Sequence, residues 1–311
     1  MNRTVKYHVQ AYNSAHDSEN KIHDDAVAGR FGFTGGLVPG VDVYAYMTHP
    51  AVAHWGRVWL ERGTAACRFA KPVYDGDAVA VAAHETPTGL DLIAESRDIA
   101  CATGEAALPA AAPAIEAFAA PPRPPAPDAR PPADEVSLAP GTLLGMRPLA
   151  FTSDFAAAYL HDVRETAPIY AAEGLAHPGM ILRTCNWALS HNVVLGPWMH
   201  VGSTVRHLGL ARVGAEITVR ARVSANTRAR ATGSWNSRRW CWRIPTGRSR
   251  GSTMWRSIGR GSWVRRYASI GACSAAARAQ AAPASSSNSS VSFFIIVPPS
   301  SSASTIVTAR R

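Results

Sequence analysis

A glycine-rich stretch from Ser18 to Met47 constrains the fold of this chain more than any other feature. It begins with a polar cluster around His23, passes through a glycine turn at residues 32–36 and ends in an apolar run. The pattern predicts a polar loop, then a helix that starts near Pro39 and ends at His49–Pro50. The first backbone N–H groups of a helix have no partner within it, so donors would lie beside the histidine loop.

Two segments of the chain resemble a known signature. The first resembles N-x-[IL]-H-x-D, followed by A, GF, G and V-x-G, through Asn20, Ile22, His23, Asp25, Ala28, Gly32, Phe33, Gly36, Val38 and Gly40. This is similar to the signature of MaoC-like, (R)-specific enoyl-CoA hydratases. The second segment, from Phe69 to Val81, resembles the strand–turn–strand of the same hotdog fold. The resemblance extends over roughly residues 15–100.

The resemblance implies a hydratase or dehydratase of 2-enoyl or 3-hydroxyacyl thioesters, with acyl-CoA or an acyl-carrier thioester as ligand. It implies no metal and no cofactor. His23 would be the general base that acts on water. The family pairs its histidine with an aspartate five positions upstream, where this chain has Ser18. We therefore expect Asp17, Glu19 or Asp25 to supply the acid.

The expected substrate contacts lie in the turn and at the start of the helix. Asn20 would fix the loop or the water. The backbone N–H of Gly40 would stabilise the charge that develops on the thioester oxygen. The remaining residues expected to contact substrate are Gly36, Val38 and Asp42.

Two alternatives to a hydratase stay open. In a hotdog thioesterase, Asp42 would activate water for attack on the thioester carbonyl. Alternatively, Asp42 is a structural carboxylate that complements the dipole of the helix. In a non-catalytic acyl-thioester-binding protein, Ser18 would mark the loss of the acid. His23 also has a structural interpretation, as a polar loop residue before a core helix.

A weak internal repeat predicts the domain organisation. Residues 168–170 (PIY) correspond to residues 21–23 (KIH), and residues 177–179 (HPG) correspond to residues 38–40 (VPG). Tyr170 therefore replaces His23, and we expect the second copy to line an acyl channel. With the resemblance, this predicts an α+β double hotdog, in which an antiparallel sheet wraps a long central helix, repeated, with an incomplete second half; a homodimer is compatible with it. The expected divisions are a first hotdog domain at 1–105, an Ala/Pro-rich linker at 106–140, a degenerate second half at 141–226 and a basic tail at 227–311.

The expected strands of the first half are Thr4 to Ala11, Gly63 to Tyr74, Ala78 to Ala83 and Leu90 to Ala102. They read as strands because apolar residues alternate along them and turn residues separate them. A helix followed by an antiparallel meander that wraps it is what a hotdog half requires.

The positive charge of the chain lies entirely in its last part. Residues 1–216 hold all 22 acidic residues and sixteen basic ones, whereas residues 217–311 hold sixteen Arg and no acid. Arg interleaved with five Trp is typical of single-stranded nucleic-acid binders. However, a GC-rich gene read out of frame gives the same composition. Shifted by one base, residues 251–260 permit Val-Asp-His-Val-Ala-Ile-Tyr-Arg, an alternating strand pattern. We favour a frameshift near residues 224–230, a disordered tail and no nucleic-acid partner.

Cysteine use and hydropathy bear on the compartment. The five cysteines show neither a CxxC motif nor metal-ligand spacing, which is typical of buried thiols in a reducing compartment. The N-terminus lacks the pattern of a signal peptide, and the apolar run at 293–297 is too short to span a bilayer. We therefore expect a cytoplasmic protein with no membrane partner.

Overall fold

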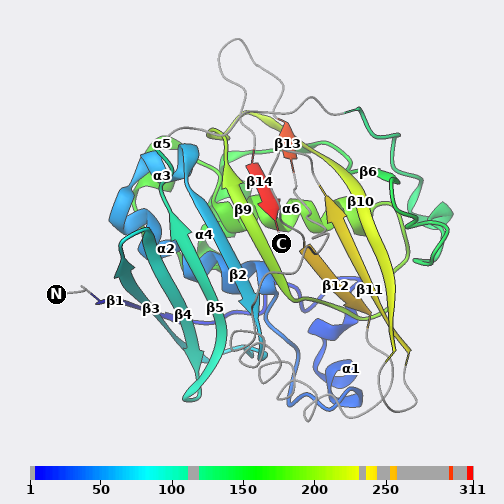
Figure 1. Cartoon of the computed structure of the whole chain (residues 1–311), viewed down its shortest axis with the longest axis horizontal. Coiled ribbons are helices and arrows are strands. Elements are labelled where there is room, and N and C mark those ends of the chain that lie inside the picture. Colours follow the sequence, from blue (N-terminus) through cyan, green and yellow to red (C-terminus); the bar gives the residue numbers. More distant parts are fainter. Residues whose placement is uncertain are drawn as a thin grey trace, which may run out of the picture.

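The computed structural model describes residues 4–110, 119–230, 236–243, 253–257, 294–296 and 307–310. Its N-terminal half is an antiparallel sheet with one long helix against it (Figure 1). The sheet order is β1-β3-β4-β5-β2. The strands are β1 (Thr4–Gln10), β2 (Thr64–Phe69), β3 (Ala78–Thr86), β4 (Gly89–Ser96) and β5 (Ile99–Ala107). The helices are η1 (Lys21–His23), α1 (Asp25–Arg30), α2 (Gly40–Trp55) and α3 (Arg57–Arg62).

Alternation along the strands produces the apolar face that meets α2. In β4, Leu90, Leu92 and Ala94 are buried, whereas Asp91 and Glu95, at alternate positions, are exposed. Successive side chains of a strand point to opposite faces, so the three apolar ones share one face. The helix buries nearly its whole first three turns against this face and its neighbours.

Two expectations for the first half are wrong in detail. The central helix starts at Gly40 as predicted but continues through Pro50 to Trp55. A proline inside a helix removes one hydrogen bond, and burial of Ala51 and Val52 beyond it offsets that cost. The expected single strand from Leu90 to Ala102 is two strands, because Arg97 and Asp98 both take positive φ (51° and 59°) and turn the chain.

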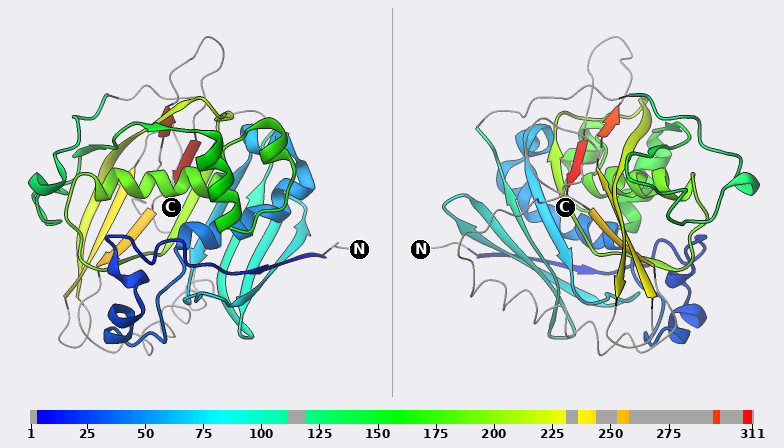
Figure 2. Two further views of the ribbon diagram at one scale, coloured as in Figure 1. Left: turned by 180° about the vertical axis from the view of Figure 1, so that it is seen from behind. Right: turned by 45° about the vertical axis from the view of Figure 1, so that its right-hand side comes forward.

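The second half repeats the plan around a second helix, α6 (Pro178–Ser190). Figure 2 shows α2 and α6 on the same side of the strands. One strand of the second half, β9, extends the first sheet by pairing antiparallel with β2, whereas β8 and β10 belong to a second sheet. The other elements are η2 (Pro127–Ala129), β6 (Leu143–Gly145), β7 (Leu149–Ala150), α4 (Ser153–Asp162), α5 (Ile169–Glu173), β8 (Trp198–His200), β9 (Gly202–His207) and β10 (Glu216–Arg230).

The two central helices pack directly on each other. The contact is close at Gly179, where a Cβ atom would lie 2.6 Å from Cβ of Ala45 and 3.0 Å from the Val41 carbonyl oxygen. Only glycine fits at this distance. The first turn of α6 therefore lies against α2, and the repeat read from the sequence becomes a pair of adjacent helices.

Strands also occur in the region expected to be a disordered tail. β11 (Asn236–Arg243) pairs with β10, and β12 (Thr253–Ser257) pairs with both β11 and β8. β13 (Phe294–Ile296) pairs with β10, and β14 (Val307–Arg310) pairs with β9. At these strands the chain has more regular structure than the sequence predicted. The other residues of the tail lie outside the described part.

The Ala/Pro-rich segment expected as a linker makes contacts of its own. Leu138 is fully buried in the main core, and Arg130 reaches the polar loop of the first half. Cys67, Cys101 and Cys185 are free and buried. Across the described residues, every helix is too short or too polar to cross a membrane.

Candidate active site

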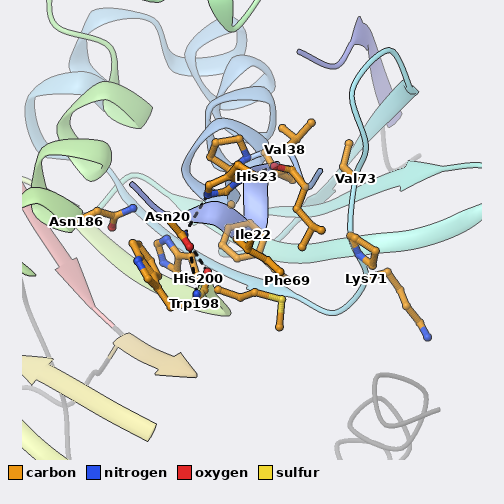
Figure 3. A pocket seen from close by; sticks show the side chains of 16 residues that line it. Asn20, Ile22, His23, Val38, Phe69, Lys71, Val73, Asn186, Trp198 and His200 are labelled. Carbon is orange, nitrogen blue, oxygen red and sulfur yellow. Dashed lines mark hydrogen bonds between the residues drawn. The ribbon is translucent and has the colours of Figure 1, made fainter. Parts of the chain in front are cut away.

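Two adjoining cavities meet at the first turn of α2. The smaller has a volume of about 50 Å³ and the larger about 520 Å³. Figure 3 shows the smaller one, with side chains from the histidine loop, β2, α6 and β8 around it. Both cavities are lined by Asn20, His23, Pro39, Asn186 and Trp198. The site therefore uses residues from both halves.

His23 is held in one tautomer by a backbone contact. Ile22, its neighbour in η1, is fully buried in a small core with Phe33 and Leu37, which fixes the loop. The ring Nδ1 lies 2.6 Å from the carbonyl oxygen of Leu37, which can only accept a hydrogen bond. Nδ1 therefore carries the proton, and Nε2 presents a lone pair.

Asn20 ties this histidine to the second half of the molecule. Its amide pairs with the backbone of Trp198 in both directions, with Nδ2 donating to the carbonyl at 2.9 Å and the backbone N–H donating to Oδ1 at 3.1 Å. The second Nδ2 proton faces His23 Nε2 at 3.2 Å, the longest of the three contacts. Asn20 thus links Nε2 of His23 to the backbone of β8 and fixes the position of that nitrogen.

The protonation state of His23 follows from its surroundings. Burial lowers its pKa below the ordinary value, since a charged imidazolium would lose hydration. The hydrogen bond to Leu37 and the charge of Asp42 oppose this effect, and the charge of Arg183 adds to it. His23 is therefore neutral, and able to accept a proton, at neutral pH.

The glycine turn passes directly over the histidine. A Cβ atom on Gly36 would lie 2.1 Å from the carbonyl oxygen of His23, so no side chain fits there. The Gly36 N–H donates to Asp25 Oδ1 at 2.6 Å, and the Val38 N–H donates to the Val73 carbonyl at 2.9 Å. These bonds hold Gly36 and Val38 at the cavity and lead the chain into Gly40.

Two of the three carboxylates expected to supply the acid share a cavity with His23, and each of the three is bound to another group. Asp17 is exposed and pairs with His16 at 2.7 Å. Glu19 accepts two bonds from Arg130, at 2.8 and 2.9 Å, and this pairing lowers its pKa. Both line the larger cavity with His23, whereas Asp25 lines neither cavity and is bound to the turn. Among the described residues, none of the three bonds to His23.

Asp42 is fully buried and lines neither cavity. Its Oδ1 accepts a bond from Arg183 on α6 at 2.8 Å, and its Oδ2 accepts one from Ser14 at 2.5 Å. Arg183 also donates to the Ser14 hydroxyl at 2.8 Å. The carboxylate is therefore engaged in an ion pair between the two central helices.

Three residues of the second half were missed by the sequence analysis. They are Asn186 on α6 and Trp198 and His200 on β8. His200 is buried with its ring edge-on to Phe69, and burial lowers its pKa to about 3, so it stays neutral. No local motif marks these positions, because only the packing of α6 and β8 against the histidine loop makes them part of the site.

The larger cavity carries more positive charge than negative. Arg130, Arg147 and Arg183 line it, and Glu19 and Asp17 are the carboxylates on its wall. Arg130 and Arg183 are paired with carboxylates. Arg147 donates to the Pro125 carbonyl at 2.7 Å and, within the described ranges, has no carboxylate partner.

No protein-family model matches the chain, and no curated protein matches it in sequence. Solved structures do match. A conserved hypothetical protein of Mycobacterium tuberculosis with a double hotdog fold is 15% identical over 82% of this chain and 94% of its own, with a TM-score of 0.51. A protein of Chloroflexus aurantiacus, named as a MaoC domain dehydratase, is 8% identical over 99% of this chain and 95% of its own, also at 0.51.

A protein of Novosphingobium aromaticivorans, named as a thioesterase, matches more weakly, at 13% identity over 81% of this chain and 93% of its own, with a TM-score of 0.41. The two stronger matches establish the architecture, and the α+β prediction is confirmed. The chain is a double hotdog protein whose structure resembles a MaoC-like dehydratase.

Proposed function

We propose that the protein hydrates 2-enoyl thioesters, or dehydrates the 3-hydroxyacyl thioesters, with His23 as its general base. The observation that carries the proposal is the fixed tautomer of His23. The bond from Nδ1 to Leu37 makes Nε2 the accepting nitrogen of the ring, and His23 lines both cavities beside the start of α2. The reacting water takes the place of the 3.2 Å contact from Asn20 Nδ2 at that lone pair.

The proposed reaction moves one proton and forms two bonds. Nε2 takes a proton from water as the water oxygen bonds to C3 of the enoyl group. The electron pair of the double bond moves toward the thioester oxygen. N–H groups of the first turn of α2, which have no partner within the helix, stabilise the enolate charge there. The proton on Nε2 then bonds to C2, so one water molecule is added overall.

The shape and charge of the cavities support an acyl thioester as the substrate. The smaller cavity is lined by apolar groups that include Val43, Phe69 and Val73, and it suits a short acyl chain. The larger one suits the longer arm of a carrier, and Arg147 offers a cation to its phosphate.

The thioesterase alternative gains no support from Asp42. A carboxylate that activates water needs a free lone pair directed at a cavity, whereas Asp42 is buried, bound to Arg183 and Ser14, and outside both cavities. The non-catalytic alternative stays open until turnover is measured.

The test compares two signals on crotonyl-CoA. A hydratase lowers the absorbance of the conjugated double bond and releases no free thiol. A thioesterase releases thiol from crotonyl-CoA and butyryl-CoA alike. Thiol release without loss of conjugation would overturn the proposal. Thermal protection by acyl-CoA with neither signal would favour the non-catalytic protein.

A further inference from the structure

Asn186 is an unusual polar residue of the site. It projects from α6, in the half of the molecule that lacks the histidine, toward the side of the cavity where Asn20 and His23 lie (Figure 3). Its Oδ1 is buried and has no hydrogen-bond partner among the described residues. It lines both cavities, as His23 does.

Other asparagines nearby are satisfied. Asn20 bonds Trp198 and His23, and Asn13 donates to the His23 carbonyl at 2.7 Å. Asn192, further along the same chain segment, donates to the carbonyls of Gly145 and Ala188, both at 2.6 Å. A buried amide oxygen without a hydrogen-bond partner makes the fold less stable. An acceptor kept at that cost inside a cavity points to a ligand that donates to it.

We infer that Asn186 binds the reacting water, and equally the 3-hydroxyl group of the hydrated thioester. This inference rests on the proposed function and adds a residue to it. The water has two protons to place. Nε2 of His23 takes one, and Asn186 Oδ1 accepts a hydrogen bond from the other, which aims an oxygen lone pair at C3.

In this arrangement, Asn186 takes over part of the role of the family's aspartate, whose position is occupied by Ser18 in this chain. Orienting the water needs an acceptor, and an amide oxygen serves without adding a charge beside His23. Because the amide is neutral, it leaves the pKa of His23 to burial and to the charges already present. The second half thus contributes to the chemistry instead of only lining the channel.

The experiment compares the binding of two ligands that differ by one hydroxyl group. (R)-3-hydroxybutyryl-CoA carries the hydroxyl and butyryl-CoA does not, and their Kd values are measured by calorimetry. We expect the Kd of the wild-type protein for the hydroxylated ligand to be about tenfold lower, which is the typical effect of one hydrogen bond. Asn186→Leu, close to isosteric, removes this preference and leaves the Kd of butyryl-CoA within about twofold. Thr184→Val on the same helix is the control, since its hydroxyl bonds Ile181 within the helix.

A second readout is the pH profile of hydration. Asn186→Leu lowers kcat by about tenfold or more with little change in KM, because water loses its second contact. Asn186→Asp restores an acceptor and, being anionic, raises the pH at which activity falls on the acid side. A purely structural asparagine would change neither the profile nor the hydroxyl preference.

The outcomes separate the two proposals. If neither thioester binds, the proposed function fails. If both bind and Asn186→Leu keeps the full preference for the hydroxylated ligand, the inference about Asn186 is wrong and the proposed function stands. Equal loss in Asn186→Leu and Thr184→Val would also overturn the inference.

Discussion

At the scale of single residues, the site depends on how backbone groups surround His23. The Leu37 carbonyl fixes the tautomer, and Asn13 Nδ2 donates a hydrogen bond to the His23 carbonyl. Gly36 crosses over that same carbonyl at a distance that admits no Cβ atom. A small displacement of this turn would therefore move the lone pair of Nε2 away from the cavity.

Gly36→Ala tests this dependence. The added methyl group would lie 2.1 Å from the His23 carbonyl oxygen, so the turn must shift. We expect hydration to fall by about tenfold or more, since misplacing a reacting group is costly. Gly29→Ala in α1 is the control, because its Cβ would meet nothing within 4 Å, and we expect it to keep wild-type activity. Equal rates in the two variants would contradict this role of Gly36.

The residues of the site were predictable where they are close in sequence. His23, Asn20 and Gly36 lie within one loop, and their types and spacing carry the resemblance. Asn186 and Trp198 lie 150 residues or more further along the chain, and only tertiary packing brings them in. Among the described residues, none of the three expected acids bonds to His23, because sequence proximity does not fix side-chain direction in a loop.

At the scale of elements, the molecule depends on the contact between α2 and α6. Gly179 allows the close approach, and the Asp42–Arg183 ion pair crosses the interface. The start of α2 was predictable, because a proline and a glycine mark it locally. The hairpin turn at Arg97–Asp98 was not, because both residues take positive φ without a glycine to announce it.

Breaking the ion pair from one side should be costly. Arg183→Met leaves the buried carboxylate of Asp42 without its cation, and we expect a loss of about 3–5 kcal/mol in the free energy of unfolding. Adding Asp42→Asn should recover most of it. Arg57→Met breaks exposed pairs with Glu61 and Glu173 and should lower the free energy of unfolding far less. Urea denaturation measures all of these, and similar losses for Arg183→Met and Arg57→Met would refute the assignment.

At the scale of the whole molecule, buried titratable groups couple stability to pH. Burial lowers the pKa of His200 and of His207 to about 3. Glu165 is buried too, which alone would raise its pKa, but bonds from His177 and His49 hold it below the usual range. All three pKa values are depressed in the fold. Their contribution to the stability of the fold is complete at pH values above the pKa values of the unfolded chain, and it is lost as pH falls below them.

We therefore expect acid to destabilise the protein below about pH 6.5, where unfolded histidines take up protons. Each of His200 and His207 should lower the free energy of unfolding by about 1.4 kcal/mol for every pH unit below about pH 6.5. Urea denaturation between pH 8 and pH 5 measures how steeply the free energy of unfolding falls with pH. His207→Phe should make this slope smaller by the contribution of one histidine, about 1.4 kcal/mol per pH unit. A variant with the wild-type slope would show that His207 does not titrate as described.

The tail carries a prediction about the gene. β12 occupies Thr253–Ser257, within the residues whose shifted reading frame gives an alternating strand. We expect the DNA at codons 220–260 to contain a frameshift, and the restored chain to give more soluble protein with a higher Tm. A restored chain that is no more soluble and whose new residues form no strand pattern would refute the frameshift. Tight, salt-dependent binding of single-stranded nucleic acid by the present chain would instead make the basic tail a functional module.

The most direct test of the whole account is the hydration rate of crotonyl-CoA by the wild-type protein and by His23→Ala at neutral pH. Circular dichroism confirms that both are folded. We predict that the wild-type protein hydrates the enoyl thioester and that His23→Ala lowers kcat by roughly 10²-fold or more, since the general base is gone. An unchanged rate in His23→Ala would contradict the account, because the fixed Nε2 lone pair would then have no part in the reaction.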